Sequence, residues 1–133
     1  MVVWIFVFIL LNSLNVNAQG TTYKMGNNKV YDCRAKLTDS EANTVNSKWY
    51  SSNEDLIFTV CVTGASKINV TFTNGFDIES KADFLKIYDG KDTSASLLKK
   101  YDNSSKPSGI ISSSDSCITF YFHSDKFVNG DGF

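Results

Sequence analysis

A succession of short segments rich in β-forming residues constrains the fold of this chain more than any other feature. The clearest is Cys117–His123, in which Ile118, Phe120 and Phe122 alternate with other residues, as on a strand with one buried face. Residues 67–73 alternate in the same way. No apolar pattern of helical period runs for a useful length, so the sequence favours strands over helices throughout.

Further strands are predicted at close intervals, and turn residues separate them. The additional segments and turns are residues 55–62, 84–88, 97–101 and 109–113, with Asn74-Gly75 and Asp89-Gly90 as turn signals. Short strands at regular spacing are typical of an antiparallel two-sheet β-sandwich. With 133 residues and no internal repeat, the chain is predicted to form one all-β domain.

The N-terminus differs in composition from the rest of the chain. Met1–Leu11 is an uninterrupted apolar run, and Ala18 closes a small-residue stretch of the kind that signal peptidase cleaves. No Lys or Arg precedes the run, so an uncleaved anchor is the alternative. We predict a signal peptide over residues 1–18, secretion to the extracellular space, and a mature chain without a membrane span. Residues 19–32 are polar and lack periodicity, which predicts a poorly ordered arm.

Charge and motifs exclude two classes of function. The formal net charge is −1, with thirteen basic and fourteen acidic residues and no basic stripe, which argues against a nucleic-acid partner. The sequence contains no HExxH and no G-x-S-x-G motif, so we expect no enzymatic activity. His123 is the single histidine and is predicted to lie exposed on a strand, while Ser124 is predicted to be a loop serine.

Secretion affects how the cysteines and the asparagines are interpreted. The chain has an odd number of cysteines, although thiols usually pair in an oxidising compartment. They are Cys33, Cys61 and Cys117. No CxxC spacing occurs and there is one histidine, so a zinc site is not expected. Asn69 and Asn103 each begin an Asn-x-Ser/Thr sequon, and both are predicted glycosylation sites.

The C-terminal segment consists mainly of turn-forming residues. Residues 124–133 follow the strongest strand, and a strand followed only by a loop becomes an exposed edge unless another strand returns to it. The sequence therefore predicts that a final strand is missing and that the chain is a fragment.

Several motifs occur in the order that characterises one extracellular family. They are Phe76-Asp-Ile-Glu79, Asp83-Phe-Leu-Lys-Ile-Tyr-Asp-Gly90, Ile110-Ile-Ser-Ser113, and Ile118-Thr-Phe-Tyr-Phe-His-Ser-Asp125 leading to Gly132-Phe133. In this order they resemble a CUB domain over residues 33–133. The resemblance implies a CUB-like jelly roll of two antiparallel sheets, in which Gly132-Phe133 would open a final strand of about ten residues, longer than a typical strand of five or six.

The resemblance also bears on the disulfides. The usual second disulfide of the family has no cysteines here, so the chain resembles a variant in which Cys33 pairs with Cys61. The loop entropy that such a disulfide removes from the unfolded chain would stabilise the fold by about 3–4 kcal/mol. Cys117 would then be unpaired within this sequence, with its partner beyond Phe133. The competing interpretations are a reactive free thiol, an intermolecular bridge, or a pair between Cys61 and Cys117.

Three acidic residues match the ligands of calcium-binding members of the family: Glu79, Asp83 and Asp125. Ca²⁺ prefers hard oxygen ligands, and neighbouring carboxylates repel one another unless a cation neutralises them. Judged from their immediate neighbours alone, these residues are as easily read as a solvated loop. In the family a tyrosine often holds the carboxylates, and here Tyr31 or Tyr50 could serve.

The implied function is recognition. The resemblance predicts a calcium-stabilised module whose acidic loop residues bind an extracellular partner protein that presents lysine or arginine. One alternative is a glycan-binding CUB domain similar to the spermadhesins. Another is a non-catalytic accessory domain of a truncated secreted protease.

Overall fold

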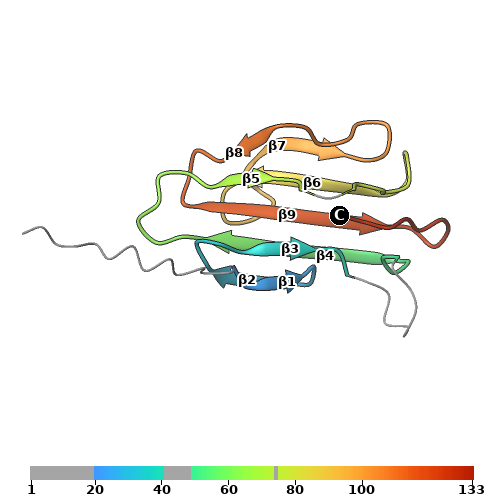
Figure 1. Ribbon diagram of the computed structural model, residues 1–133, viewed down its shortest axis with the longest axis horizontal. Helices are drawn as coiled ribbons and strands as arrows, with labels where there is room; N and C mark the ends of the chain where they lie inside the picture. Colours follow the sequence, from blue (N-terminus) through green and yellow to red (C-terminus); the bar gives the residue numbers. More distant parts are fainter. Residues whose placement is uncertain (1–19, 41–48, 74) are drawn as a thin grey trace, which may run out of the picture.

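A computed structural model describes residues 20–40, 49–73 and 75–133 of the chain. The described residues contain no helix and form nine strands, which confirms the predicted all-β sandwich. The strands are β1 (Thr22–Lys24), β2 (Asn28–Tyr31), β3 (Lys36–Thr38), β4 (Glu54–Cys61), β5 (Asn69–Thr71), β6 (Phe84–Asp89), β7 (Ser96–Tyr101), β8 (Ile110–Ser112) and β9 (Cys117–Ser124). Figure 1 shows them running along the long axis of the molecule.

One layer of the sandwich is a five-stranded sheet in the order β2-β4-β9-β6-β7. β2 runs parallel to β4, and the other neighbours are antiparallel. The strand β9, which the sequence would leave as an exposed edge unless another strand returned to it, lies between β4 and β6 and pairs with both. It is central because both partners come from earlier in the chain, at paired positions more than thirty residues away.

The core lies behind the inner face of this sheet. Ile118, Phe120 and Phe122 of β9 are buried, as their alternation predicts, and Leu85 and Ile87 of β6 are fully buried beside them. Burying a large apolar side chain contributes about 1.5–3 kcal/mol, so this alternation holds the register of the central strands.

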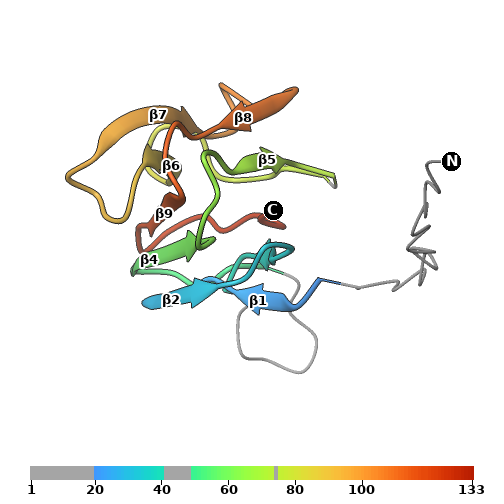
Figure 2. The same ribbon diagram turned by 90° about the vertical axis from the view of Figure 1, so that its left-hand side faces the viewer.

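The second layer consists of two separate pairs of strands. β1 pairs with β3, and β5 pairs with β8. Figure 2 shows both pairs on the same side of the five-stranded sheet, with β3 and β5 as the inner strands. Within the described residues neither β3 nor β5 pairs with a strand on its other side.

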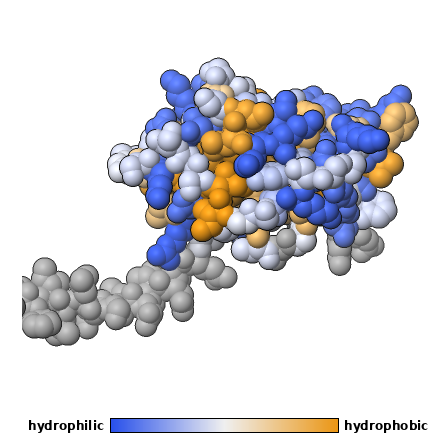
Figure 3. Space-filling view, turned by 90° about the horizontal axis from the view of Figure 1, so that it is seen from above, coloured by the Kyte–Doolittle hydropathy of each residue, from blue (hydrophilic) through white to orange (hydrophobic). Residues whose placement is uncertain are grey.

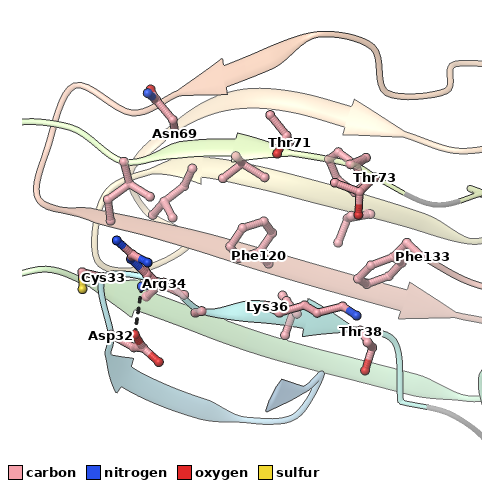
Figure 4. Close-up of a pocket in the computed structure, with 18 of the residues that line it drawn as sticks. Asp32, Cys33, Arg34, Lys36, Thr38, Asn69, Thr71, Thr73, Phe120 and Phe133 are labelled. Atoms are coloured by element: carbon pink, nitrogen blue, oxygen red, sulfur yellow. Dashed lines mark hydrogen bonds between the residues drawn. The ribbon is translucent and has the colours of Figure 1, made fainter. Parts of the chain in front are cut away.

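A groove of about 440 Å³ lies between these two inner strands. Figure 4 shows β5 on one side, β3 on the other, and Phe120 on the floor. Phe133 lines the groove at one end and Cys33 at the other. Here the apolar core meets the surface between two strand edges that lack hydrogen-bonded partners, and such edges favour the pairing of a further strand.

The last residues of the chain enter this groove from the end of β9. Asp77 and Gly132 form an antiparallel bridge, and the Asp39 N–H donates to the Phe133 carbonyl at 3.3 Å. Gly132 has φ of 79°, and a Cβ there would lie 1.9 Å from the Asp39 carboxylate. Glycine is therefore required at this position, both by the left-handed backbone and by the close approach.

The disulfide in the structure differs from the expected one. Cys61 is bonded to Cys117, and Cys33 is a free, exposed cysteine. The expected pair of Cys33 with Cys61 is wrong, as is a partner for Cys117 beyond Phe133. The physical reason is register: Cys61 and Cys117 stand directly opposite each other on antiparallel β4 and β9, where side chains on one face meet.

The N-terminal region also differs from expectation. β1 and β2 lie within residues 19–32, the predicted poorly ordered arm, and their short sequences have no alternation that would have revealed them. They form because β3 and β4 offer parallel edges, a tertiary effect. The predicted signal peptide, residues 1–18, lies outside the described residues.

Exposed apolar side chains occur on the face that carries β7 and β8, where Figure 3 shows an apolar band among hydrophilic residues. Among the large exposed side chains of these two strands are Leu97 and Ile110. Apolar residues contribute to the surface of every soluble domain, so these two need no partner to account for them.

Candidate metal centre

The three predicted ligands come from two chain segments that meet at one end of the five-stranded sheet. Asp83 immediately precedes β6, and Asp125 immediately follows β9. Because β6 and β9 are antiparallel neighbours, with Phe84 opposite His123, the start of one strand lies beside the end of the other. Glu79 is brought to the same place by the loop that leads into β6.

The carboxylates converge closely. One oxygen atom from each of Glu79, Asp83 and Asp125 lies within 4.8 Å of the others. Asp83 is fully buried, while Glu79 and Asp125 are half-buried. The structure thus brings together the three residues that the resemblance singled out, although they span more than forty positions of the sequence.

Tyr50 is the tyrosine that holds the cluster. Its hydroxyl donates to Oδ2 of Asp83 at 2.6 Å and accepts from the Glu79 N–H at 3.1 Å. The ring is buried edge-on against Phe122, with centroids 5.0 Å apart. Tyr31, the other candidate, lies on β2 and is 72% exposed. Sequence alone could not choose between them because the segment before β4 has no motif.

Burial, followed by the hydrogen bond to Asp83, raises the pKa of Tyr50 above its ordinary value. The hydroxyl therefore stays protonated at physiological pH and remains a donor to the carboxylate. Its second contact, from the backbone N–H of Glu79, fixes the loop that carries Glu79. Tyr50 is thus a positioning residue for two of the three acids.

Asp125 is held mainly through its backbone. Its N–H donates to Oδ1 of Asp83 at 2.7 Å, and its carbonyl accepts from the Asn53 N–H at 2.8 Å. Ser124 beside it donates to the Ser51 carbonyl at 2.7 Å and accepts from the Glu54 N–H at 3.0 Å. These contacts join the end of β9 to the segment before β4, and Ser124 is the buried last residue of β9 and not a loop serine as predicted.

The cluster has the character of a cation site. Oε2 of Glu79 is buried and has no hydrogen-bond partner among the described residues. Burial first, and then the carboxylates of Asp83 and Asp125, raise the pKa of Glu79 above its ordinary value. A buried acceptor without a donor and three like charges at short range are both relieved by a hard cation. The oxygen donor set therefore fits Ca²⁺.

The raised pKa of Glu79 predicts how pH affects the domain. Without metal, the folded protein holds a proton on Glu79 that the unfolded chain has already lost, so stability falls as pH rises from 4.5 through the raised pKa. Calcium requires the ionised carboxylate, so its affinity should rise over the same range, with proton release on binding. Calorimetry in two buffers of different ionisation enthalpy measures that release. Equal heats in both buffers at the acid end of the range would contradict this prediction.

The fold and the site define an all-β sandwich with a carboxylate cluster at one end of the five-stranded sheet, and comparisons with known proteins name its family. The family model described as "CUB domain" matches residues 33–133. The chain belongs to the CUB domain family. CUB domains are generally non-catalytic interaction modules, and their homologues are extracellular or secreted proteins.

Relatives of this chain are proteins of much greater length. Tolloid-like protein 2 of Mus musculus is 28% identical over 108 residues, and that of Homo sapiens is 30% identical over 108 residues. Both alignments cover 76% of this chain and 10% of the relative, so the chain spans about a tenth of the length of the curated relatives it matches.

A solved structure of the same fold is the MASP-1 CUB2 domain bound to Ca²⁺. It has a TM-score of 0.50 and 22% identity, and the alignment covers 63% of this chain and 76% of that one. This likeness supports the fold. Among the residues that the structure describes, there is no helix long and apolar enough to cross a membrane.

Proposed function

We propose that this chain is a secreted, calcium-stabilised recognition module that binds a partner protein through Glu79, Asp83 and Asp125. The convergence of their carboxylate oxygens within 4.8 Å carries the proposal. Calcium would supply positive charge that gathers the three carboxylates and the loops bearing them. Family membership and the calcium-bound structural neighbour support this assignment.

The three acidic residues have different roles in this proposal. Asp83 is buried and holds Tyr50 and the Asp125 backbone, so it anchors the site from within. Glu79 and Asp125 are half-buried, so these two residues are more accessible than Asp83. A lysine or arginine of a partner protein would meet these acids in a charge-assisted contact on loops that are already held in place.

Calcium should stabilise the native chain and not a Glu79→Gln variant. The affinity expected is that of extracellular modules, about 10⁻⁴–10⁻³ M, so 10 mM calcium corresponds to roughly 10–100 Kd and to about 1.4–2.7 kcal/mol. Glutamine keeps the size of the side chain and removes the charge, so the variant should be at least as stable as the native chain in EDTA. Thermal unfolding with calcium and with EDTA measures both effects.

The matched control is Glu54→Gln, which removes a half-buried carboxylate outside the cluster. It should keep the full calcium-dependent rise in Tm. An equal rise in Tm for the Glu79→Gln variant, or no rise for the native chain, would reject the metal centre.

The two sequons differ in whether the asparagine amide nitrogen is available to a glycan. Asn69 is exposed on β5, and its Oδ1 accepts from the Ser112 hydroxyl at 2.7 Å, which leaves Nδ2 for a glycan. Asn103 is half-buried, its Nδ2 donates to Asp77 at 2.6 Å, and its Oδ1 is buried. Since N-glycans attach to Nδ2, we propose that Asn69 is glycosylated in a secretory host and that Asn103 is not.

Enzymatic deglycosylation followed by peptide mapping checks this prediction. The Asn69→Gln variant should lose the glycan-dependent mobility shift, and Asn103→Gln should leave it unchanged. A glycan found on Asn103 would contradict the structural role of its amide.

A further inference from the structure

The loop that follows β9 presents apolar side chains at the end of the molecule that carries the proposed metal centre. Residues 126–128 are exposed, and they include Phe127 at 66% and Val128 at 62%. Figure 1 shows this loop extending beyond the end of β9 before the chain turns back. We call Phe127 and Val128 the apolar tip.

The loop is held on both sides of the apolar tip by hydrogen bonds to the segment before β4. Before the tip, the Asp125 carbonyl accepts from the Asn53 N–H at 2.8 Å. After the tip, Oδ1 of Asn129 accepts from the Ser52 hydroxyl at 3.1 Å. Because both ends of the loop are fixed, a partner that covers the tip has little conformational freedom to remove from it.

The apolar tip adjoins the metal centre through a direct contact. The Phe127 N–H donates to Oδ1 of Asp125 at 2.7 Å. The same carboxylate has an oxygen within 4.8 Å of oxygens of Glu79 and Asp83. Lys126 lies beside the tip, with its ammonium group 4.8 Å from the centroid of the Phe127 ring. The carboxylate that would bind calcium therefore also fixes the backbone from which the Phe127 side chain projects.

This contact distinguishes the apolar tip from other exposed apolar side chains of the domain. Leu97 and Ile110 are 51% and 66% exposed on β7 and β8, and neither strand supplies one of the three acids. In protein interfaces aromatic side chains are enriched, and a few well-placed apolar contacts supply much of the affinity. An exposed phenylalanine that is bonded to a ligand of the metal centre is placed to make such a contact.

We propose that the apolar tip is a second contact point for the partner protein, which presents an apolar side chain next to the lysine or arginine bound at the three carboxylates. The inference rests on the proposed function of these acids and specifies the partner further. Charge favours a protein over a membrane surface at this site. Three ionised carboxylates exceed the charge of one Ca²⁺ by one unit, so they attract a basic side chain and repel an anionic lipid headgroup.

Two synthetic peptides test this contact against isotope-labelled protein in 10 mM calcium. Each has one lysine, which is flanked on both sides by leucine in one peptide and by serine in the other. Covering an apolar side chain is favourable, so the leucine peptide should bind about tenfold more tightly in an NMR titration. The shifts that depend on leucine should centre on residues 126–128, and EDTA should abolish the binding of both peptides.

The Phe127→Thr/Val128→Thr variant should bind both peptides equally, with the affinity that the native chain has for the serine peptide. Its calcium-dependent rise in Tm should persist, because the contact with Asp125 uses the backbone N–H, which threonine retains. The matched control, Leu97→Thr/Ile110→Thr, removes two exposed apolar side chains from β7 and β8 and should keep the tenfold preference.

The possible outcomes separate this inference from the proposed function. Equal binding of both peptides by the native chain, with calcium dependence retained, would overturn the apolar contact and leave the proposed function standing. A leucine preference that persists in the variant without the tip would also overturn the contact. Calcium-dependent cosedimentation of the native chain, and not of this variant, with phosphatidylserine vesicles would assign the tip to a membrane instead. Failure of both peptides to bind in a calcium-dependent manner would overturn both.

Discussion

A variant with alanine at both Cys61 and Cys117 should have a free energy of unfolding about 4 kcal/mol below that of the native chain. The two cysteines are 56 residues apart. Closing a loop removes conformational entropy from the unfolded chain, and the resulting stabilisation is about 3 kcal/mol for 15 residues and about 4.7 kcal/mol for 100 residues. The value for this disulfide lies between these two. Chemical denaturation measures the difference. The free energy of unfolding of a native domain is only about 5–15 kcal/mol in total, so the variant should be close to unfolding.

The single variant Cys33→Ser is the matched control for the disulfide. Cys33 is exposed and free, so this change should alter the free energy of unfolding by less than about 0.5 kcal/mol. Peptide mapping without reduction should recover Cys61 linked to Cys117. A large loss of stability on replacing Cys33, or a peptide linking Cys33 to Cys61, would contradict the pairing.

A strand-forming segment joined to the carboxyl end of Phe133 should enter the groove between β3 and β5 and raise Tm by about 5–10 °C. Figure 4 shows that a chain leaving Phe133 toward Cys33 would run antiparallel to β3. Eight residues of alternating valine and threonine would place apolar side chains on the groove floor and complete both open edges. Burying each valine side chain stabilises the folded state by about 1.5–3 kcal/mol, and the conformational entropy lost when the segment becomes ordered offsets much of this gain.

The predicted final strand of the family would take this place. A segment of the same composition with two prolines is the control, because proline cannot donate to either neighbouring strand. Hydrogen exchange should show added protection at Leu37 on β3 and at Thr71 on β5 for the alternating segment alone, because their amides face the open edges. Equal Tm values for the two segments would show that the groove does not accept a strand.

The candidate site shows how far sequence reasoning extends in this chain. Glu79, Asp83 and Asp125 could be named beforehand because the motifs around them have a fixed order in the family. Tyr50 could not be chosen over Tyr31, since only the packing of Tyr50 against Phe122 places its hydroxyl on Asp83.

Local alternation in the sequence determined where the longer strands lie and which of their faces is buried, because side-chain direction on a strand repeats every two residues whatever the partner is. It determined β6 and β9 in this way, whereas β4 was indicated by its content of β-forming residues. Only the tertiary structure decided that β9 is central, that Cys61 meets Cys117, and that β1 and β2 form at all. Those outcomes depend on which distant segments become neighbours, and pairing across more than thirty residues leaves no periodic mark in either segment.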